Sequence, residues 1–258
     1  MLAVKRLHVH NNYSAATLVR WDIEDTSELL DDFTFNVYAS LSSASEFTKI
    51  NEEPITGFSY LYNHPFVSDS SVKLYFKVEV VNTTTQESVL CSAVGAAYLT
   101  PSDPIADTII YQNEVLLKRV LGRPPVKLLI KRRAGTRCSV CWDEELMEVT
   151  KSNCINCYST GYKDGYLPPE EIYISFTEPG FITRFDVADV KDVQQGVTQA
   201  WSSNYPLILP SDVIVDEFNR RFIVMQVQPT TKSGLIYLRQ LLQLQLLPPT
   251  DIIYKLEM

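Results

Sequence analysis

The chain has 258 residues, which is more than one small domain usually contains, so at least two hydrophobic cores are expected. A hydrophobic fraction of 45% and a charged fraction of 21% exclude a disordered chain. No apolar run reaches the ~18 residues of a membrane helix, and Lys5 and Arg6 are followed by polar residues rather than by the apolar core of a signal peptide. A soluble protein with a net charge of −8 is therefore predicted.

The first hundred residues consist of short alternating segments separated by turn residues, a pattern typical of a β-sandwich. Within the segment 72–82, for example, large apolar side chains alternate with polar ones, which predicts one buried and one exposed face. The predicted strands are 4–10, 16–23, 33–40, 47–51, 57–63, 72–82 and 88–99.

Three aromatic residues in these strands follow a family pattern. Trp21 lies in the second predicted strand, Tyr38 in the third, and Tyr75 in the strand that would carry a tyrosine corner. In their order and spacing, residues 1–100 resemble a fibronectin type III domain. The resemblance implies a sandwich with Trp21 and Tyr75 in its core, serving as an adhesion or spacer module without chemistry of its own.

A boundary and a helix follow the predicted sandwich. The segment 100–107 contains two prolines, which favours a domain boundary. Apolar residues then recur at helical spacing over 105–122, and either Asp103 or Asp107 is placed to cap the helix. Residues 101–122 are interpreted as a linker and an amphipathic connector helix that packs on a neighbouring domain or subunit.

Positive charge is concentrated in the last turn of this predicted helix and in the segment that follows it. The segment 118–137 contains no acidic residue. It suggests a contact with nucleic acid or another anion, a patch that docks on acidic neighbours, or a solvated strand face, since its lysines alternate with apolar residues. Its eight basic residues are Lys118, Arg119, Arg123, Lys127, Lys131, Arg132, Arg133 and Arg137.

The remaining residues, 123–258, are predicted to form a second, small β-barrel with a cysteine loop inserted near its start. The segment 207–229 has the pattern of a strand, a turn at 217–220 and a second strand. The segment 234–248 alternates over much of its length, as expected for a strand paired on both sides. Further strands are predicted at 124–135, before 176, at 182–190 and at 251–258, so the whole chain is expected to be mainly β.

Four of the five cysteines form two CxxC pairs, Cys138 with Cys141 and Cys154 with Cys157. Each CxxC turns two thiolates toward one side of a tight knuckle, so two knuckles supply a closed tetrahedral shell. The sequence therefore predicts a zinc site in the loop 138–157 with these four ligands. The alternatives are free or disulfide-bonded thiols and a rubredoxin-like iron site, in which glycine usually follows the second cysteine of each pair.

No catalytic residue is predicted. His8, His10 and His64 lie in the predicted sandwich without a nearby cluster of Asp, Glu or Cys. The sequence has no glycine-rich phosphate loop, no GxSxG and no HExxH, and the acidic residues of the cysteine loop read as a solvated turn. Four thiolates leave no coordination position for a reactive water, so the zinc is expected to be structural.

The residues around the cysteines carry a second resemblance. The segment 126–169 resembles a part of structural proteins of tailed bacteriophages, with Asp164 in place of the first glycine of a GGY turn. The segments 211–228 and 235–258 are similar to the barrel of head-completion or stopper proteins of the phage neck. The matching positions are Arg137-Cys138, Cys141-Trp142-Asp143, Cys154, Cys157-Tyr158, Thr160-Gly161-Tyr162 and Gly165-Tyr166.

This resemblance implies a virion protein that is assembled in the bacterial host cytoplasm. It would be a neck, or head-to-tail connector, component that forms a homo-oligomeric ring between portal and tail. Its partners would be portal or adaptor and tail proteins, with passage of DNA, no sequence-specific DNA binding and no membrane contact. Two alternatives remain open, another tail or baseplate structural protein and a zinc-ribbon nucleic-acid-binding protein.

Overall fold

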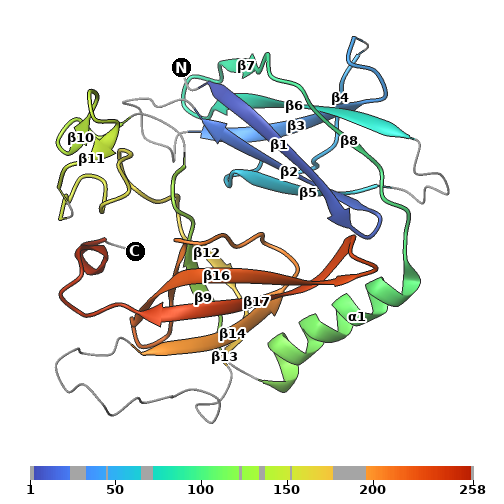
Figure 1. Cartoon of the computed structure of the whole chain (residues 1–258). Helices are drawn as coiled ribbons and strands as arrows, with labels where there is room; N and C mark the ends of the chain where they lie inside the picture. The colour runs from blue at the N-terminus through green and yellow to red at the C-terminus, as the bar shows by residue number, and fades with distance from the viewer. Residues whose placement is uncertain are drawn as a thin grey trace. The chain divides into compact units, whose positions relative to one another are not determined.

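The structure is a computed structural model that describes residues 3–23, 33–44, 46–64, 72–121, 124–133, 137–151, 153–176 and 196–256. The chain divides into two compact units, one of residues 1–107 with 133–136 and one of residues 108–132 with 137–258 (Figure 1). Antiparallel strands dominate both units, which confirms the mainly β prediction. The predicted strand at 182–190 lies outside the described residues.

The first unit contains two antiparallel sheets. Strands β1, β2 and β5 form one sheet in that order, and the other has the order β4-β3-β6-β7, with β8 also paired to β6. The predicted strand 88–99 is divided into β7 and β8. The strands are β1 Val4–Tyr13, β2 Ala16–Ile23, β3 Phe33–Ser40, β4 Thr48–Lys49, β5 Ser59–Asn63, β6 Lys73–Asn82, β7 Ser88–Leu90 and β8 Gly95–Tyr98.

Aromatic rings fill the space between these two sheets. Trp21 of β2 is 1% exposed, and its ring centroid lies 5.3 Å from that of Phe35 in β3, which is itself 5.3 Å from Phe58. The expectation that Tyr75 also belongs to the core is wrong. Because Phe76 points inward and side chains alternate along β6, Tyr75 must face outward, where it lies half-buried beneath the ammonium group of Lys73.

The predicted helix is present as α1, Pro104–Val115, continued by a π-helical turn at Leu116–Val120. Of the two candidate caps, Asp103 is the one used, since its Oδ1 accepts hydrogen bonds of 3.0 Å from the backbone N–H groups of Ile105 and Ala106. Within the described part of the chain, no helix has the length and apolar character needed to cross a bilayer.

The second unit is built on a seven-stranded antiparallel sheet with the order β12-β9-β15-β16-β17-β14-β13. Its two edge strands, β12 and β13, are consecutive in the chain and separated only by Tyr173, so the edges meet and the sheet closes into a barrel. The strands are β9 Val126–Leu129, β12 Glu170–Ile172, β13 Ile174–Phe176, β14 Val197–Ser203, β15 Val213–Val215, β16 Arg221–Lys232 and β17 Ile236–Leu246.

Two of the detailed strand predictions are confirmed. β15 and β16 pair on either side of the turn at 217–220, and β17 is paired with β14 on one side and β16 on the other. The described core of the barrel is mostly apolar, and Gln240 is a polar residue that is fully buried there. Its side-chain amide accepts a hydrogen bond from the backbone N–H of Ile208 and donates to the carbonyl of Pro206, so burial leaves its polar atoms paired.

A second apolar cluster lies on the outer face of β15. It joins Val213 and Val215 to Tyr166 of the cysteine loop and to the 3-10 helix Ile252–Lys255, which stands where a strand was wrongly predicted at 251–258. All three residues of β15 are buried, because Ile214 faces the barrel interior and its two neighbours face this outer cluster. The cluster is the surface on which the cysteine loop rests.

Candidate metal centre

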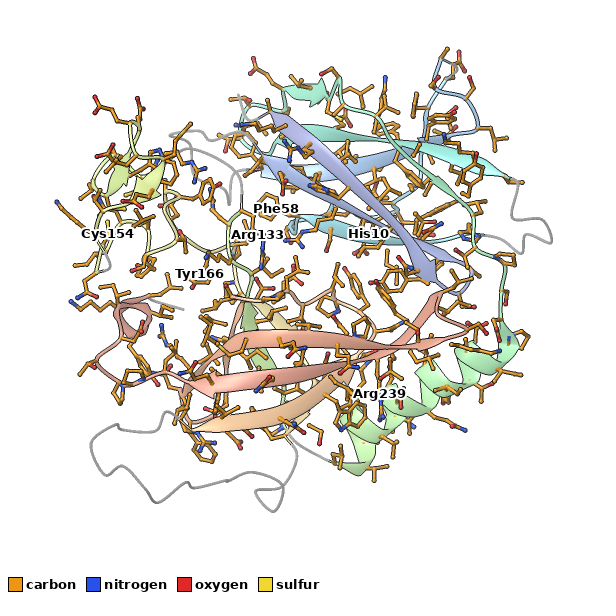
Figure 2. The ribbon with its side chains drawn as sticks, viewed as in Figure 1. His10, Phe58, Arg133, Cys154, Tyr166 and Arg239 are labelled. Carbon is orange, nitrogen blue, oxygen red and sulfur yellow. The ribbon has the colours of Figure 1, made fainter. Side chains whose placement is uncertain are left out.

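The cysteine loop connects β9 to β12 and contains a small hairpin, β10 Trp142–Asp143 and β11 Glu148–Val149. In Figure 2, Cys154 marks this loop and Tyr166 marks the end of it that joins the barrel. The hairpin lies between the two CxxC pairs, so it projects from the first knuckle and returns the chain to the second.

The structure brings all four predicted cysteines together. Their sulfur atoms lie within 4.8 Å of one another, and each side chain is at most 5% exposed. A tetrahedral shell with metal–sulfur bonds of ~2.3 Å has edges of about 3.8 Å between sulfurs. The Sγ atoms of Cys138 and Cys154 are 3.7 Å apart and those of Cys141 and Cys157 are 3.2 Å apart, so the cluster can hold a metal ion.

These distances also bear on the disulfide alternative. A disulfide bond is about 2.05 Å long, and all five cysteines of the chain are free thiols in the structure. Both of these short contacts pair one cysteine of the first knuckle with one of the second, as in a shell shared between two CxxC turns.

Backbone hydrogen bonds shape the two knuckles and join them. The carbonyl of Cys138 accepts from the N–H of Trp142 at 2.9 Å, and that of Cys157 accepts from the N–H of Thr160 at 2.9 Å. The N–H of Cys138 donates to the carbonyl of Gly161 at 3.0 Å, which connects the first knuckle to the second. These hydrogen bonds direct the four cysteine side chains toward one point, although the knuckles themselves are not part of a sheet.

Acid–base properties of the cluster depend on burial. Burial raises the pKa of Cys141, and the neighbouring thiols raise it further; burial also raises the pKa of Cys157. Burial opposes ionisation of Cys154 too, but hydrogen bonds from the backbone N–H of Asn156 and from the thiol of Cys138 outweigh it and lower its pKa. A bound cation would favour thiolates throughout the cluster.

Arg137, the residue before the first cysteine, clamps the loop. Its guanidinium carbon lies 3.7 Å from the ring centroid of Trp142 and 4.2 Å from that of Tyr162. Trp142 follows the first knuckle and Tyr162 follows the second, so one planar cation stacks on residues from both. The sequence showed these three residues as part of a pattern but did not indicate that they contact one another.

Two glycines of the loop occupy positions that no side chain fits. Gly161 has a φ of +80°, and a Cβ there would lie 2.8 Å from Cγ2 of Val149. Gly165 has a φ of +62°, and a Cβ there would lie 2.5 Å from the carbonyl oxygen of Cys157. Asp164, which departs from the GGY pattern, has a φ of 61°; Asp tolerates this left-handed conformation better than most residues, so the turn still forms.

The loop is fixed to the barrel at its C-terminal end. The N–H of Arg132 donates to the carbonyl of Gly165, and the N–H of Leu167 donates to the carbonyl of Ile130, both at 2.9 Å. Tyr166 is buried in the outer apolar cluster, and Tyr158 packs against the same cluster. The four-cysteine cluster is thus tied both by hydrogen bonds and by aromatic packing to β15 and the C-terminal 3-10 helix.

The basic segment does not form a single surface. Lys127 belongs to β9, an inner strand of the barrel sheet, and lies opposite Glu171. Arg132 is buried, and Arg137 is stacked between two rings. Lys118 and Arg119 are exposed at the end of the helical segment. The eight cations therefore have different environments, and Arg123 lies outside the described residues.

A histidine contact in the first unit was not indicated by the sequence. Nε2 of His8 lies 3.0 Å from Oδ2 of Asp22, its diagonal neighbour across the β1–β2 pair, in which His8 lies opposite Arg20 and Asp22 opposite Arg6. The pKa of His10 is lowered by burial and by the neighbouring positive charges of His8 and Arg20. His64 is buried. None of the three histidines lies in a metal-binding cluster among the described residues.

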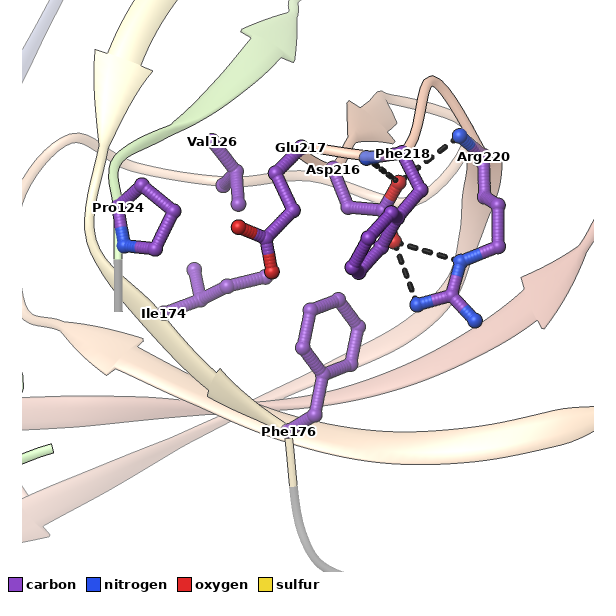
Figure 3. A pocket seen from close by; sticks show the side chains of 8 residues that line it. All are labelled: Pro124, Val126, Ile174, Phe176, Asp216, Glu217, Phe218 and Arg220. Atoms are coloured by element: carbon purple, nitrogen blue, oxygen red, sulfur yellow. Dashed lines mark hydrogen bonds and ion pairs between the residues drawn. The ribbon is translucent and has the colours of Figure 1, made fainter. Parts of the chain in front are cut away.

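One small pocket opens at the turn between β15 and β16 (Figure 3). Its walls are apolar except for Glu217 and the ion pair of Asp216 and Arg220, whose Oδ2 and Nη2 atoms are 2.7 Å apart. Asp216 also accepts hydrogen bonds from the N–H groups of Phe218 and Arg220, so its carboxylate shapes the turn. The lining residues are Pro124, Val126, Ile174, Phe176, Asp216, Glu217, Phe218 and Arg220.

Comparison with known proteins adds no relative. No protein-family model matches the chain, and no curated protein matches its sequence. The function of the cysteine loop is therefore inferred from its residues and their geometry.

Proposed function

We propose that this chain is a structural virion protein of a tailed bacteriophage, a neck or head-to-tail connector component that forms a homo-oligomeric ring between portal and tail. The observation that carries the proposal is the construction of the cysteine loop. Among the residues that resemble the phage segment, Arg137 stacks on Trp142 and Tyr162 and so joins the two knuckles, and Gly161 and Gly165 allow close approaches that a side chain would prevent. These residues stabilise the loop and take no part in chemistry, which suits a structural component that contacts neighbouring proteins.

The metal in this proposal is a structural zinc ion held by Cys138, Cys141, Cys154 and Cys157. Four thiolates complete a tetrahedral shell, so no position remains for a water that could be activated. Trp142 and Tyr158 follow the second cysteine of each pair, where rubredoxin-like iron sites usually carry glycine, and this favours zinc over iron. The ion would supply the loop with the stability that its few apolar side chains cannot.

The other parts of the chain suit an assembly role. The sandwich of the first unit serves as a spacer module on the outside of the ring, as its fibronectin type III-like pattern suggests. A net charge of −8 keeps duplex DNA from adhering as it passes. The portal or adaptor proteins and the tail proteins would be the neighbours of the ring in the virion.

A zinc-ribbon nucleic-acid-binding protein is the second candidate, favoured by the exposed cations Lys118 and Arg119 beside the barrel. Native mass spectrometry and negative-stain imaging of the purified chain, together with DNA titrations at several salt concentrations, separate the two. Closed rings with weak DNA binding support the neck proposal. A monomer whose DNA affinity falls steeply with salt overturns it in favour of the second candidate.

Imaging of whole particles distinguishes the neck from other virion positions. Density for the chain between portal and tail supports the proposal, whereas density in the tail or baseplate moves the same structural role to another site. Elemental analysis of protein purified under reducing conditions tests the metal, with one zinc ion per chain as the expected result.

A further inference from the structure

The cysteine loop ends in an exposed tip of unusual composition. Leu146 and Met147 are 64% and 74% exposed at the turn between β10 and β11. Three exposed carboxylates flank them, those of Glu144, Glu145 and Glu148. The turn is fixed, since Oδ1 of Asp143 accepts hydrogen bonds from the N–H groups of Glu145 and Leu146 at 2.9 and 3.0 Å. These five residues, 144–148, are called the acidic tip.

The end of the helical segment has the opposite charge and a similar apolar content. Leu116, Val120 and Leu121 are 41%, 66% and 41% exposed; Val120 and Leu121 lie one turn after Leu116, because this turn is π-helical, with the N–H of Leu121 bonded to the carbonyl of Leu116. Lys118 and Arg119 are exposed in the same turn, and the ammonium group of Lys118 forms an ion pair of 3.3 Å with Glu114. The five exposed residues, 116 and 118–121, are called the basic helix end.

Both surfaces belong to the second unit, and they lie far apart in it (Figure 1). The hairpin β10–β11 projects at one extreme of the unit, and the helix ends at another, so one copy does not bring its own two surfaces together. Exposed apolar residues rimmed by charge are typical of sites where proteins meet. Both surfaces combine exposed apolar residues with charged ones, and their charges are of opposite sign.

We propose that the acidic tip of one copy binds the basic helix end of the next copy. The occupant of each surface is thus a second copy of this chain, and the contact is the subunit interface of the ring in the proposed function, on which this inference rests. Because the two surfaces differ, the contact is head-to-tail, and such contacts build a ring when the rotation between copies closes.

Charge reversal on the full-length chain tests the contact. Glu144→Lys with Glu145→Lys makes both surfaces positive, and Lys118→Glu with Arg119→Glu makes both negative. Each pair is expected to weaken self-association roughly 100-fold in sedimentation velocity, since like charges then face each other. The chain carrying all four substitutions restores complementarity and is expected to associate within about tenfold of the unaltered protein. An equimolar mixture of the two pairs should also associate.

A matched control separates the contact from overall charge. Glu52→Lys with Glu53→Lys changes the net charge as the tip pair does, but at exposed positions of the first unit, and it should leave association unchanged. Metal content, measured in every variant, reports that the loop is folded. If the tip variant loses its metal, the helix-end pair alone decides the question, because it leaves the cysteine loop unaltered: association that this pair does not weaken overturns the contact.

The outcomes distinguish this inference from the proposed function. Rings that withstand both charge reversals, or a four-substitution chain that does not recover, overturn the tip-to-helix contact and leave the ring proposal standing. An unaltered chain that is monomeric at all concentrations overturns both.

Discussion

Replacing Cys154 with serine tests whether a metal ion folds the cysteine loop. The only buried apolar cluster described within the loop consists of the four cysteines, with the half-buried Val149 against it. Ordering the backbone of one residue costs about 1 to 2 kcal/mol, so five small side chains cannot order a loop of this length. In the proposed function a metal ion supplies most of this free energy, so removal of one of its four ligands should open the loop.

The size of the effect follows from this composition. Structural zinc contributes about 10 to 16 kcal/mol to the folding of zinc-finger peptides at neutral pH. Loss of about 4 kcal/mol, a fraction of that amount, raises the population of the open loop about 1000-fold. The barrel has its own interior core, with Leu128, Ile214 and Leu244 all fully buried, so its cooperative unfolding should change much less than the opening of the loop.

Hydrogen exchange read by mass spectrometry measures both quantities in one experiment. Amides of residues 138–166 should exchange about 1000-fold faster in Cys154→Ser, while those of β16 and β17 stay protected. Cys91→Ser is the matched control, because Cys91 lies outside the cluster and burial raises the pKa of its thiol. A serine there can keep the hydrogen bonds with the N–H of Val78 and the carbonyl of Ala93. Full metal content and undiminished loop protection in Cys154→Ser would refute the reasoning.

Three further changes probe single contacts. Gly165→Ala should destabilise the loop by about 1 to 3 kcal/mol and lower metal retention. Gly234→Ala should have a smaller effect, because Gly234 has a φ of +73° but no atom within 4 Å of the new Cβ. Equal losses of metal in chelator titrations of the two variants would show that the clash with Cys157 is unimportant. Arg137→Lys should cost the loop about 0.5 to 1 kcal/mol per lost stack, and unchanged chelation kinetics would contradict the clamp. Because the pKa of His10 is lowered in the folded state, its neutral form contributes stability that is present above its ordinary pKa and is lost as the pH falls through the lowered value. Acid unfolding of the first unit should therefore shift to lower pH in His10→Gln, and an unshifted midpoint would exclude this role.

Local patterns in the sequence predicted what depends on near neighbours. Alternation over 72–82 and 234–248 identified β6 and β17 and their faces correctly, because side chains of a strand alternate wherever it lies. For Tyr75, this alternation was a better guide than the family resemblance, which implied a core position. A small barrel was predicted, but the way it closes was not, because closure depends on one segment, 170–176, pairing at both edges of the sheet.

In the candidate site, too, features that depend on residues close in the sequence were predictable, and features that depend on distant residues were not. Two CxxC pairs twelve residues apart predict a four-cysteine cluster, because each knuckle is local and the hairpin between them is short. The stacking of Arg137 on Trp142 and Tyr162 depends on how the two knuckles meet. Gln240 could not have been placed inside the barrel either, since its partners, Ile208 and Pro206, lie in a loop some thirty residues earlier.

The metal cluster and the proposed subunit contact are linked through the hairpin. Both the N–H and the hydroxyl of Thr150, just after β11, donate to the carbonyl of Cys141, at 2.8 and 3.0 Å, so the first knuckle sets the direction in which the tip projects. Cys154→Ser changes no charge on the tip, yet it should abolish self-association because the tip loses its orientation. Lys118→Glu with Arg119→Glu should weaken association while the metal stays bound.

Sedimentation velocity and metal analysis on the same samples therefore distinguish the two variants: Cys154→Ser should lose both metal and association, and Lys118→Glu with Arg119→Glu should lose association alone. Rings that persist in Cys154→Ser after the metal is lost would mean that the acidic tip does not bind a neighbour, whatever holds the ring together. Rings lost together with the metal, and restored when zinc is returned to chelated unaltered protein, would show that the ion acts on assembly by fixing one hairpin.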